Sequence, residues 1–177
     1  MFFASAVTAD KYWANNVTAQ NVSTKEILAY VIEYNGKVGD QRDLYFGQGG
    51  FTPGATQVIT EWPSDTPKLP DTLQAKVLYV QFVDGTEWGD HSAGEKLLQS
   101  RQGSLQFMTN LIAAYNKGGE AAFMTLLNQT HENSTGMVWG MSVHFLKMKT
   151  EMGMAGALQH IQMKLASAAK HDKTLNP

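Results

Sequence analysis

The stretch VLYVQFVDGTEWGD, residues 77–90, decides the fold because a strand pattern ends in it and a helix pattern follows it. Its first seven residues are aliphatic, β-branched or aromatic apart from one Gln, which is typical of a strand. The dipeptide Asp84-Gly85 then favours a hairpin turn, so residues 86–88 are expected to form the returning strand. This segment predicts an antiparallel pair at the end of a β-rich first half.

Further strands are predicted upstream of this hairpin. Residues 17–22 and 27–34 are rich in β-branched and aromatic residues, and a short polar turn separates them. Residues 55–62 are expected to form another strand, and residues 44–46 a short one within a Gly-rich loop. Three prolines between residues 63 and 70 predict an irregular connection. With a first strand at the start of the chain, six or seven short strands predict a β-sandwich.

The pattern after Asp90 changes to a helical period. Ser92 followed by Glu95 is typical of a capping box at a helix start. A stripe with spacings of three and four then continues to Gly118-Gly119, which predicts the end of this helix; it comprises Leu97, Leu98, Arg101, Leu105, Met108, Leu111, Ile112 and Tyr115. A shorter helix is expected over residues 120–129 and a long one from about residue 136 to 171, with kinks at its glycines.

Composition and length support this division of the chain. The 177 residues are 43 % hydrophobic and 17 % charged, which is typical of a globular protein. The fold class is therefore predicted to be α+β, with an immunoglobulin-like antiparallel β-sandwich over residues 1–90 and a helical extension of two to three helices over residues 91–177. No apolar run reaches the roughly 18 residues of a membrane span. The absence of Cys excludes disulfides, thiol catalysis and Cys-zinc sites.

Charge is distributed unevenly between the two halves. Residues 1–90 carry 11 acidic and 6 basic side chains, whereas residues 91–177 carry 5 acidic and 8 basic ones. The positive half is suited to an anionic partner or to the acidic half of a neighbouring copy, but it lacks the dense basic stripe of a nucleic-acid binder. We therefore expect a protein partner, either the chain itself or another protein, that binds through the helical half, and no nucleic acid.

Three segments carry a resemblance to a known group of proteins. They are NVSTKEILAY at residues 21–30, TPGAT at residues 52–56 and VQFVDGTEWGD at residues 80–90. Together they resemble uncharacterised bacterial proteins in which an N-x-S-x-K-x-I-x-A strand, a PG turn and an F-x-DG-x-x-x-GD strand end occur in this order. The resemblance covers roughly residues 15–115 and implies an immunoglobulin-like sandwich followed by helices. It brings no catalytic residues with it.

The resemblance also implies export, so a periplasmic or secreted location is favoured over a cytoplasmic one. The first six residues, MFFASA, are interpreted as a strand. The alternative is the remnant of an export signal, although a basic region and a full apolar region are missing.

Three carboxylates lie close together in the sequence around the hairpin. Asp84, Glu87 and Asp90 fall within seven residues, beside Trp88. Hard oxygen ligands of this kind are suited to Ca²⁺, and a pair of carboxylates is suited to general acid and base catalysis. The structural alternative is a hairpin turn at Asp84 and a helix cap at Asp90.

A second candidate set lies on the last helix. His144, Met148 and Met152 are spaced by four residues, which places an imidazole and two thioethers on one face, with Met141 one turn earlier. Thioether and imidazole ligands are suited to Cu(I), and a Met/His pair is a known haem ligation. The alternative is packing, because Met fills irregular gaps between helices.

These patterns rank three functions. The first is a non-enzymatic binding or structural protein without cofactors, because no specific catalytic signature occurs in the sequence. The second is a carbohydrate-active or metal-dependent hydrolase that uses Asp84, Glu87 and Asp90. The third is a copper or haem protein that uses His144, Met148 and Met152. The sequence assigns no residue a definite catalytic, cofactor or metal role.

Overall fold

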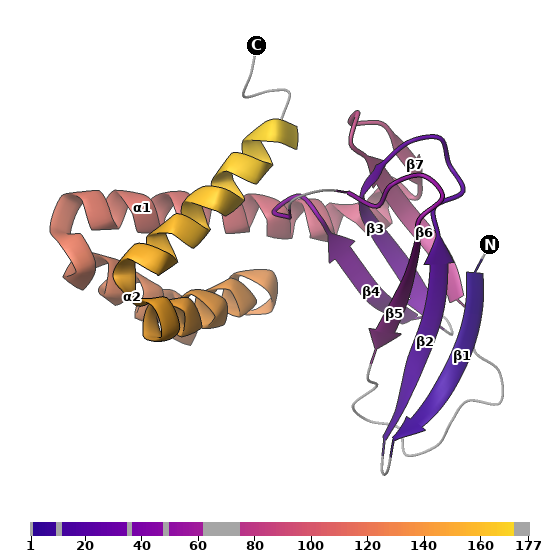
Figure 1. The fold of residues 1–177 in the computed structure, drawn as a ribbon, viewed down its shortest axis with the longest axis horizontal. Helices are drawn as coiled ribbons and strands as arrows, with labels where there is room; N and C mark the ends of the chain where they lie inside the picture. The colour runs from indigo at the N-terminus through magenta and orange to yellow at the C-terminus, as the bar shows by residue number, and fades with distance from the viewer. Residues whose placement is uncertain (1, 10–11, 35–36, 48–49, 62–74, 172–177) are drawn as a thin grey trace. The chain divides into compact units, whose positions relative to one another are not determined.

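The computed structural model describes residues 2–9, 12–34, 37–47, 50–61 and 75–171 of the chain. The chain folds into two compact units, Met1–Gly94 and Glu95–Pro177. The fold class is α+β, as predicted, with the strands in the first unit and helices making up the second (Figure 1). The predicted proline-rich connection falls within residues 62–74, outside the described residues.

Two antiparallel sheets make up the first unit. One sheet has the order β1-β2-β5 and the other the order β4-β3-β6-β7 (Figure 1). The bounds of the strands in chain order are β1 Phe2–Ala9, β2 Tyr12–Gln20, β3 Ile27–Tyr34, β4 Lys37–Asp43, β5 Thr56–Glu61, β6 Ala75–Phe82 and β7 Glu87–Gly89. The predicted strands at residues 27–34 and 77–83 and the hairpin after them are confirmed, as is the first strand.

The core of this unit is formed by side chains from both sheets. Ala19 of β2 clusters with Tyr30 and Ile32 of β3, Val80 of β6 and Phe51 of the loop before β5. The residues between these positions on β3 are buried as well, because Ala29 and Val31 are completely shielded from solvent. Burial on both sides explains why β3 reads as a nearly continuous apolar run.

The expected short strand at residues 44–46 is wrong. The strand is β4, whose sequence KVGDQRD is polar, and Leu44 follows it into a turn. As the outer strand of its sheet, β4 is held by backbone pairing with β3. The spacing of apolar residues therefore does not predict this strand. Tyr45 and Phe46 are buried in the turn instead, with their rings edge to face at 5.3 Å between centroids.

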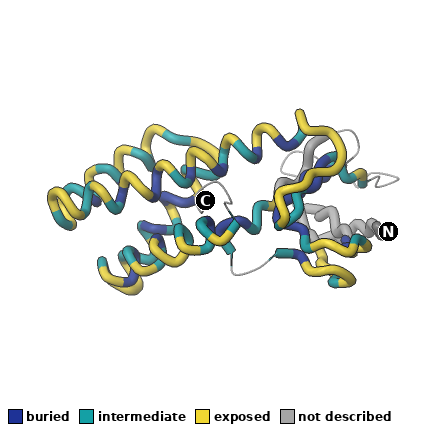
Figure 2. The backbone as a smooth tube through the Cα atoms, turned by 90° about the horizontal axis from the view of Figure 1, so that it is seen from above, coloured by how far each residue is buried: buried dark blue, intermediate teal, exposed yellow. Residues whose placement is uncertain are grey.

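The helices are α1 (His91–Asn133) and α2 (Gly136–His171). There are thus two helices in the described chain, the lower of the two numbers predicted, and each contains an internal break. Gly118 and Gly119 leave helical geometry within α1, where the first helix was expected to end, and Gly153 does so within α2. Buried positions recur along both helices, and Leu97, Met108 and Leu111 of the predicted stripe are completely buried (Figure 2).

The predicted capping box is wrong, because the helix cap lies two residues before Ser92. The cap is Asp90, because its Oδ1 accepts hydrogen bonds from the backbone N–H and the hydroxyl of Ser92, at 3.0 and 2.7 Å. Ser92 lies inside α1, which begins at His91. A carboxylate accepts the free amide donors of a helix start as well as a Ser hydroxyl does, and its charge also favours the positive end of the helix dipole.

Neither α1 nor α2 contains a stretch that is both long and apolar enough to cross a bilayer within the described residues.

Candidate functional site

The residues that carry the sequence motifs converge on one corner of the sheet unit. The Nζ of Lys25 lies 2.7 Å from Oδ2 of Asp84 and donates a hydrogen bond to Oγ1 of Thr86 at 2.9 Å. It also lies 5.6 Å from the centre of the Phe82 ring. The lysine of the first motif is therefore bound to the aspartate of the third motif and lies near its aromatic residue. This ammonium joins the loop between β2 and β3 to the β6–β7 hairpin, and Lys25 and Thr86 are 61 residues apart in the chain.

Asn21 begins the first motif and ties three backbone segments together. Its side-chain amide donates to the carbonyl oxygens of Lys25 and Phe51, at 2.8 and 2.7 Å. Its Oδ1 accepts from the N–H and the hydroxyl of Ser23, at 3.0 and 2.7 Å. Asn21 is only 2 % exposed, and its backbone N–H donates to the carbonyl of Ala55. The buried side chain of this asparagine therefore makes hydrogen bonds that a backbone segment would otherwise make, and these bonds fix the loop between β2 and β3.

Glu87 and Asp90 are likewise engaged in contacts within the fold. The hydroxyl of Tyr79 donates to Oε1 of Glu87 at 2.8 Å, and Nδ1 of His91 lies 2.8 Å from Oε2 of the same carboxylate. The ring of Tyr79 is completely buried, and a side chain at Gly94 would lie 2.6 Å from it. Gly94 is therefore required for the close approach of the first turn of α1 to β6.

Hydrogen bonds at the hairpin stabilise the ionised form of the carboxylates. The hydrogen bond from Lys25 holds the pKa of Asp84 far below its usual range, with a further contribution from Thr86. The hydrogen bonds from Ser92 lower the pKa of Asp90. Neither group has the raised pKa of a general acid. Among the residues that the structure describes, no group of three or more His, Asp or Glu side chains is placed to hold a metal ion.

The helical unit brings together two histidines that the sequence left apart. The rings of His144 and His160 lie 4.7 Å apart between centroids, at 58° to each other. They lie on opposite sides of the Gly153 break in α2. The expected set of His144 with Met148 and Met152 did not include His160. Of the two thioether residues, Met148 is partly buried, whereas Met152 is 59 % exposed.

Burial lowers the pKa of His144, and the nearby charges of His160, Lys164 and Lys147 lower it further, against an opposing effect of Glu151. Burial also lowers the pKa of His160, with a contribution from Lys164, so both rings are held neutral at physiological pH. Within the described chain, the buried Nε2 of His144 makes no hydrogen bond. A buried ring nitrogen without a partner is uncommon and requires an explanation.

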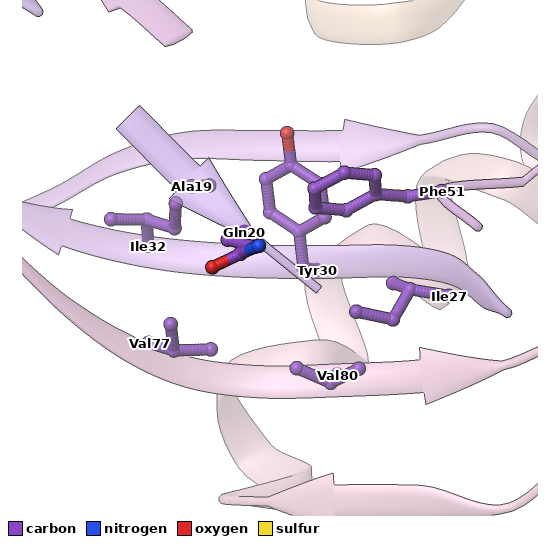
Figure 3. A pocket seen from close by; sticks show the side chains of 8 residues that line it. All are labelled: Ala19, Gln20, Ile27, Tyr30, Ile32, Phe51, Val77 and Val80. Atoms are coloured by element: carbon purple, nitrogen blue, oxygen red, sulfur yellow. The ribbon is translucent and has the colours of Figure 1, made fainter. Parts of the chain in front are cut away.

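A small cavity lies between the two sheets (Figure 3). Its volume is about 40 Å³, and its lining is mainly apolar: Ala19, Gln20, Ile27, Tyr30, Ile32, Phe51, Val77 and Val80. This space is far below the roughly 300 Å³ of a small-molecule site. We interpret it as a packing defect in the core of the sheet unit.

Large apolar side chains are exposed in both units. In the sheet unit these are Val22 in the loop after β2, Val58 in β5 and Trp88 in β7. In the helical unit they all belong to α2, namely Trp139, Val143, Met152 and Met163. Trp139 and Val143 are one turn apart and therefore share a face. Trp139 also stacks on the ring of His131, at 5.9 Å and 20°.

Comparisons with protein-family models, with curated proteins and with solved structures found no match for this chain.

Proposed function

We propose that this chain is a non-enzymatic protein-interaction module, in which an immunoglobulin-like sandwich serves as scaffold and the helical unit binds the partner. The order of the strands supports the first part. In constant-type immunoglobulin domains the first, second, fourth and fifth strands share one sheet, and the third, sixth and seventh share the other. The orders β1-β2-β5 and β4-β3-β6-β7 agree with this arrangement in every strand except β4, which pairs with β3 at the edge of the other sheet.

The observation that carries the non-enzymatic assignment is the engagement of all three candidate carboxylates. Asp84 closes a turn and pairs with Lys25, and Asp90 caps α1. Glu87 accepts from Tyr79 at the edge of the sheet. A glycoside hydrolase needs one carboxyl group that stays protonated near neutral pH, yet the pKa values of Asp84 and Asp90 are shifted downward.

The helical unit offers the better binding surface because α2 combines apolar exposure with positive charge. Trp139 is 46 % exposed and Met152 is 59 % exposed. The helix also carries one glutamate, Glu151, and four lysines, at residues 147, 149, 164 and 170. Aromatic residues and Met are enriched in protein interfaces. The expected partner is therefore a protein with an acidic and partly apolar surface.

A second copy of this chain offers such a surface, since residues 1–90 carry five more acidic than basic side chains. Contacts of one half with the other half of a neighbour are heterologous and generate rings or filaments. We therefore propose self-association through α2 as the first interaction to test.

Sedimentation velocity of the full chain at rising protein concentration tests this proposal. We expect concentration-dependent assembly that weakens with added salt, because screening reduces attraction between exposed charges. Trp139→Ser is expected to abolish assembly, whereas the control Gln102→Ser, which changes an exposed side chain of α1, is expected to leave it unchanged. A monomer at every concentration and salt would contradict self-association.

We also propose that the protein is exported from a bacterial cell. The support is the resemblance of its three motif segments to exported sandwich proteins, together with a cysteine-free composition that is compatible with an oxidising compartment. Cell fractionation of the native host with an antibody against the chain is the test, and recovery only with the cytoplasm would contradict it.

A further inference from the structure

The break at Gly153 creates a site that helical periodicity alone does not predict. Gly153 has a φ of 71°, a conformation that favours glycine, so the chain changes direction between the two segments of α2. The change brings His160 against His144, which lies on the preceding segment. Two neutral imidazoles thus meet from opposite sides of a turn.

The distance between the rings is suited to a shared ion. Two imidazoles that each bind one metal ion through a nitrogen at about 2.1 Å have ring centroids roughly 5 Å apart, depending on the angle at the metal. The observed 4.7 Å agrees with this geometry. The buried Nε2 of His144 makes no hydrogen bond to any residue that the structure describes, so it supplies a free lone pair in one tautomer.

A third ligand follows from the helix geometry. Met148 lies one turn after His144, on the same face, and is partly buried. No Asp or Glu completes a three-residue cluster with the two histidines among the described residues. The available donors are therefore two imidazole nitrogens and one thioether sulfur.

We propose that His144, His160 and Met148 bind one Cu(I) ion. Thioether ligands are soft and select Cu(I), and imidazole also binds copper well. The charge of the surroundings favours a monovalent ion as well, because Lys164 and Lys147 raise the local positive potential and Glu151 offsets only part of it. A divalent Zn²⁺ would add twice the charge to a site without a carboxylate ligand.

Titration of the full chain with Cu(I), under anaerobic conditions with ascorbate and a chromophoric Cu(I) chelator as competitor, tests the proposal. We expect one Cu(I) per chain, and His160→Gln and His144→Gln should each weaken its binding by at least roughly tenfold, since even outer partners of a metal site contribute about that much. Met148→Leu, which retains the volume, should weaken it as well. The matched control is His131→Gln, because His131 lies in the same unit but contacts Ser142 and Trp139.

Far-UV circular dichroism of each variant verifies that the helices are retained. Three results would overturn the proposal: the chelator removes all Cu(I) from the wild type, the His144→Gln/His160→Gln double variant binds as tightly as the wild type, or Zn²⁺ displaces Cu(I) from the site. Unchanged binding in Met148→Leu alone would overturn the assignment of the thioether.

Discussion

The two units of this protein use polar groups in opposite ways. In the sheet unit, the polar side chains of the motif corner are hydrogen-bonded or paired, and Asn21 alone makes four side-chain hydrogen bonds. In the helical unit, the buried Nε2 of His144 has no hydrogen-bond partner within the described chain, and four large apolar residues of α2 are exposed. Paired polar groups stabilise a scaffold, whereas a buried polar group without a partner requires an explanation, of which a bound ion is one.

The largest expected effect tests the scaffold half of this comparison. Asn21→Asp keeps the shape of the side chain but replaces its two N–H donors with an oxygen that faces the carbonyls of Lys25 and Phe51. We expect a loss of about 3 kcal/mol or more in the free energy of unfolding, because two buried acceptors lose their partners. Urea denaturation measures this loss.

The matched control for this change is Gln20→Glu. It makes the same amide-to-carboxylate replacement one residue earlier, at an exposed side chain with a single long contact of 3.4 Å to Gly54. It is expected to change stability by less than about 0.5 kcal/mol. Equal losses in the two variants would show that Asn21 does not hold the corner together.

A second prediction concerns the start of α1. Gly94→Ala places a methyl group 2.6 Å from the buried ring of Tyr79, so we expect a loss of roughly 1–3 kcal/mol by overpacking. Gly103→Ala in the same helix meets only Val138, at 3.6 Å, and is expected to stabilise by up to about 1 kcal/mol through helix propensity. Thermal unfolding of the two variants measures the contrast, and stabilisation by both would contradict the close packing at Tyr79.

These contrasts also explain what the sequence could and could not predict. Val77, Tyr79 and the Asp84-Gly85 turn were predictable because strand pattern and turn chemistry are local properties. β4 was missed because an edge strand is held by backbone pairing, which its polar side chains do not reveal. The helix start was displaced because Ser92 and Asp90 are both good caps, and geometry alone decides between them.

The sites were less predictable than the fold. Asp84 and Asp90 were correctly weighed as a turn residue and a cap, since both roles are local. The contact of Lys25 with Asp84 joins the loop between β2 and β3 to the β6–β7 hairpin, and that of His144 with His160 depends on the direction of the chain after Gly153. No periodicity within one segment encodes such pairings, although a glycine between two histidines in a helical pattern was the available signal.

A third prediction is that the stability of the two units depends on pH in different ranges. Both His144 and His160 have lowered pKa values in the fold, so the unfolded chain binds more protons below its ordinary His pKa near 6.5. Stability of the helical unit is therefore fully present above about pH 6.5 and falls as the pH decreases toward the folded pKa values. The pKa values of the carboxylates Asp84 and Asp90 are also lowered, and these groups change the stability of the sheet unit only below about pH 4.

Thermal unfolding followed by far-UV circular dichroism between neutral and mildly acidic pH tests this separation. The melting temperature of the helices is expected to fall in the wild type and to depend less on pH in the His144→Gln/His160→Gln variant. His131→Gln is the control and should retain the wild-type dependence, since His131 is not part of the pair. Identical pH profiles in all three proteins would refute a role for the histidine pair.

The smallest expected effect concerns the cavity between the sheets. Val77→Ile adds one methylene to a wall of the 40 Å³ space and should stabilise the sheet unit by about 0.5 kcal/mol. Val58→Ile makes the same change at a side chain that is 68 % exposed and should have no measurable effect. Urea denaturation distinguishes them, and a loss of stability in Val77→Ile would indicate that the cavity cannot accept a larger side chain.

The most direct test of the central claim, that the motif corner supports the fold while α2 binds the partner, is sedimentation velocity on two variants of equal net charge. Lys25→Gln/Asp84→Asn removes the ion pair of the corner, and Trp139→Ser removes the exposed indole of α2. We predict that the first variant assembles like the wild type and that the second stays monomeric. Loss of assembly in a folded Lys25→Gln/Asp84→Asn variant, with normal assembly of Trp139→Ser, would contradict the claim.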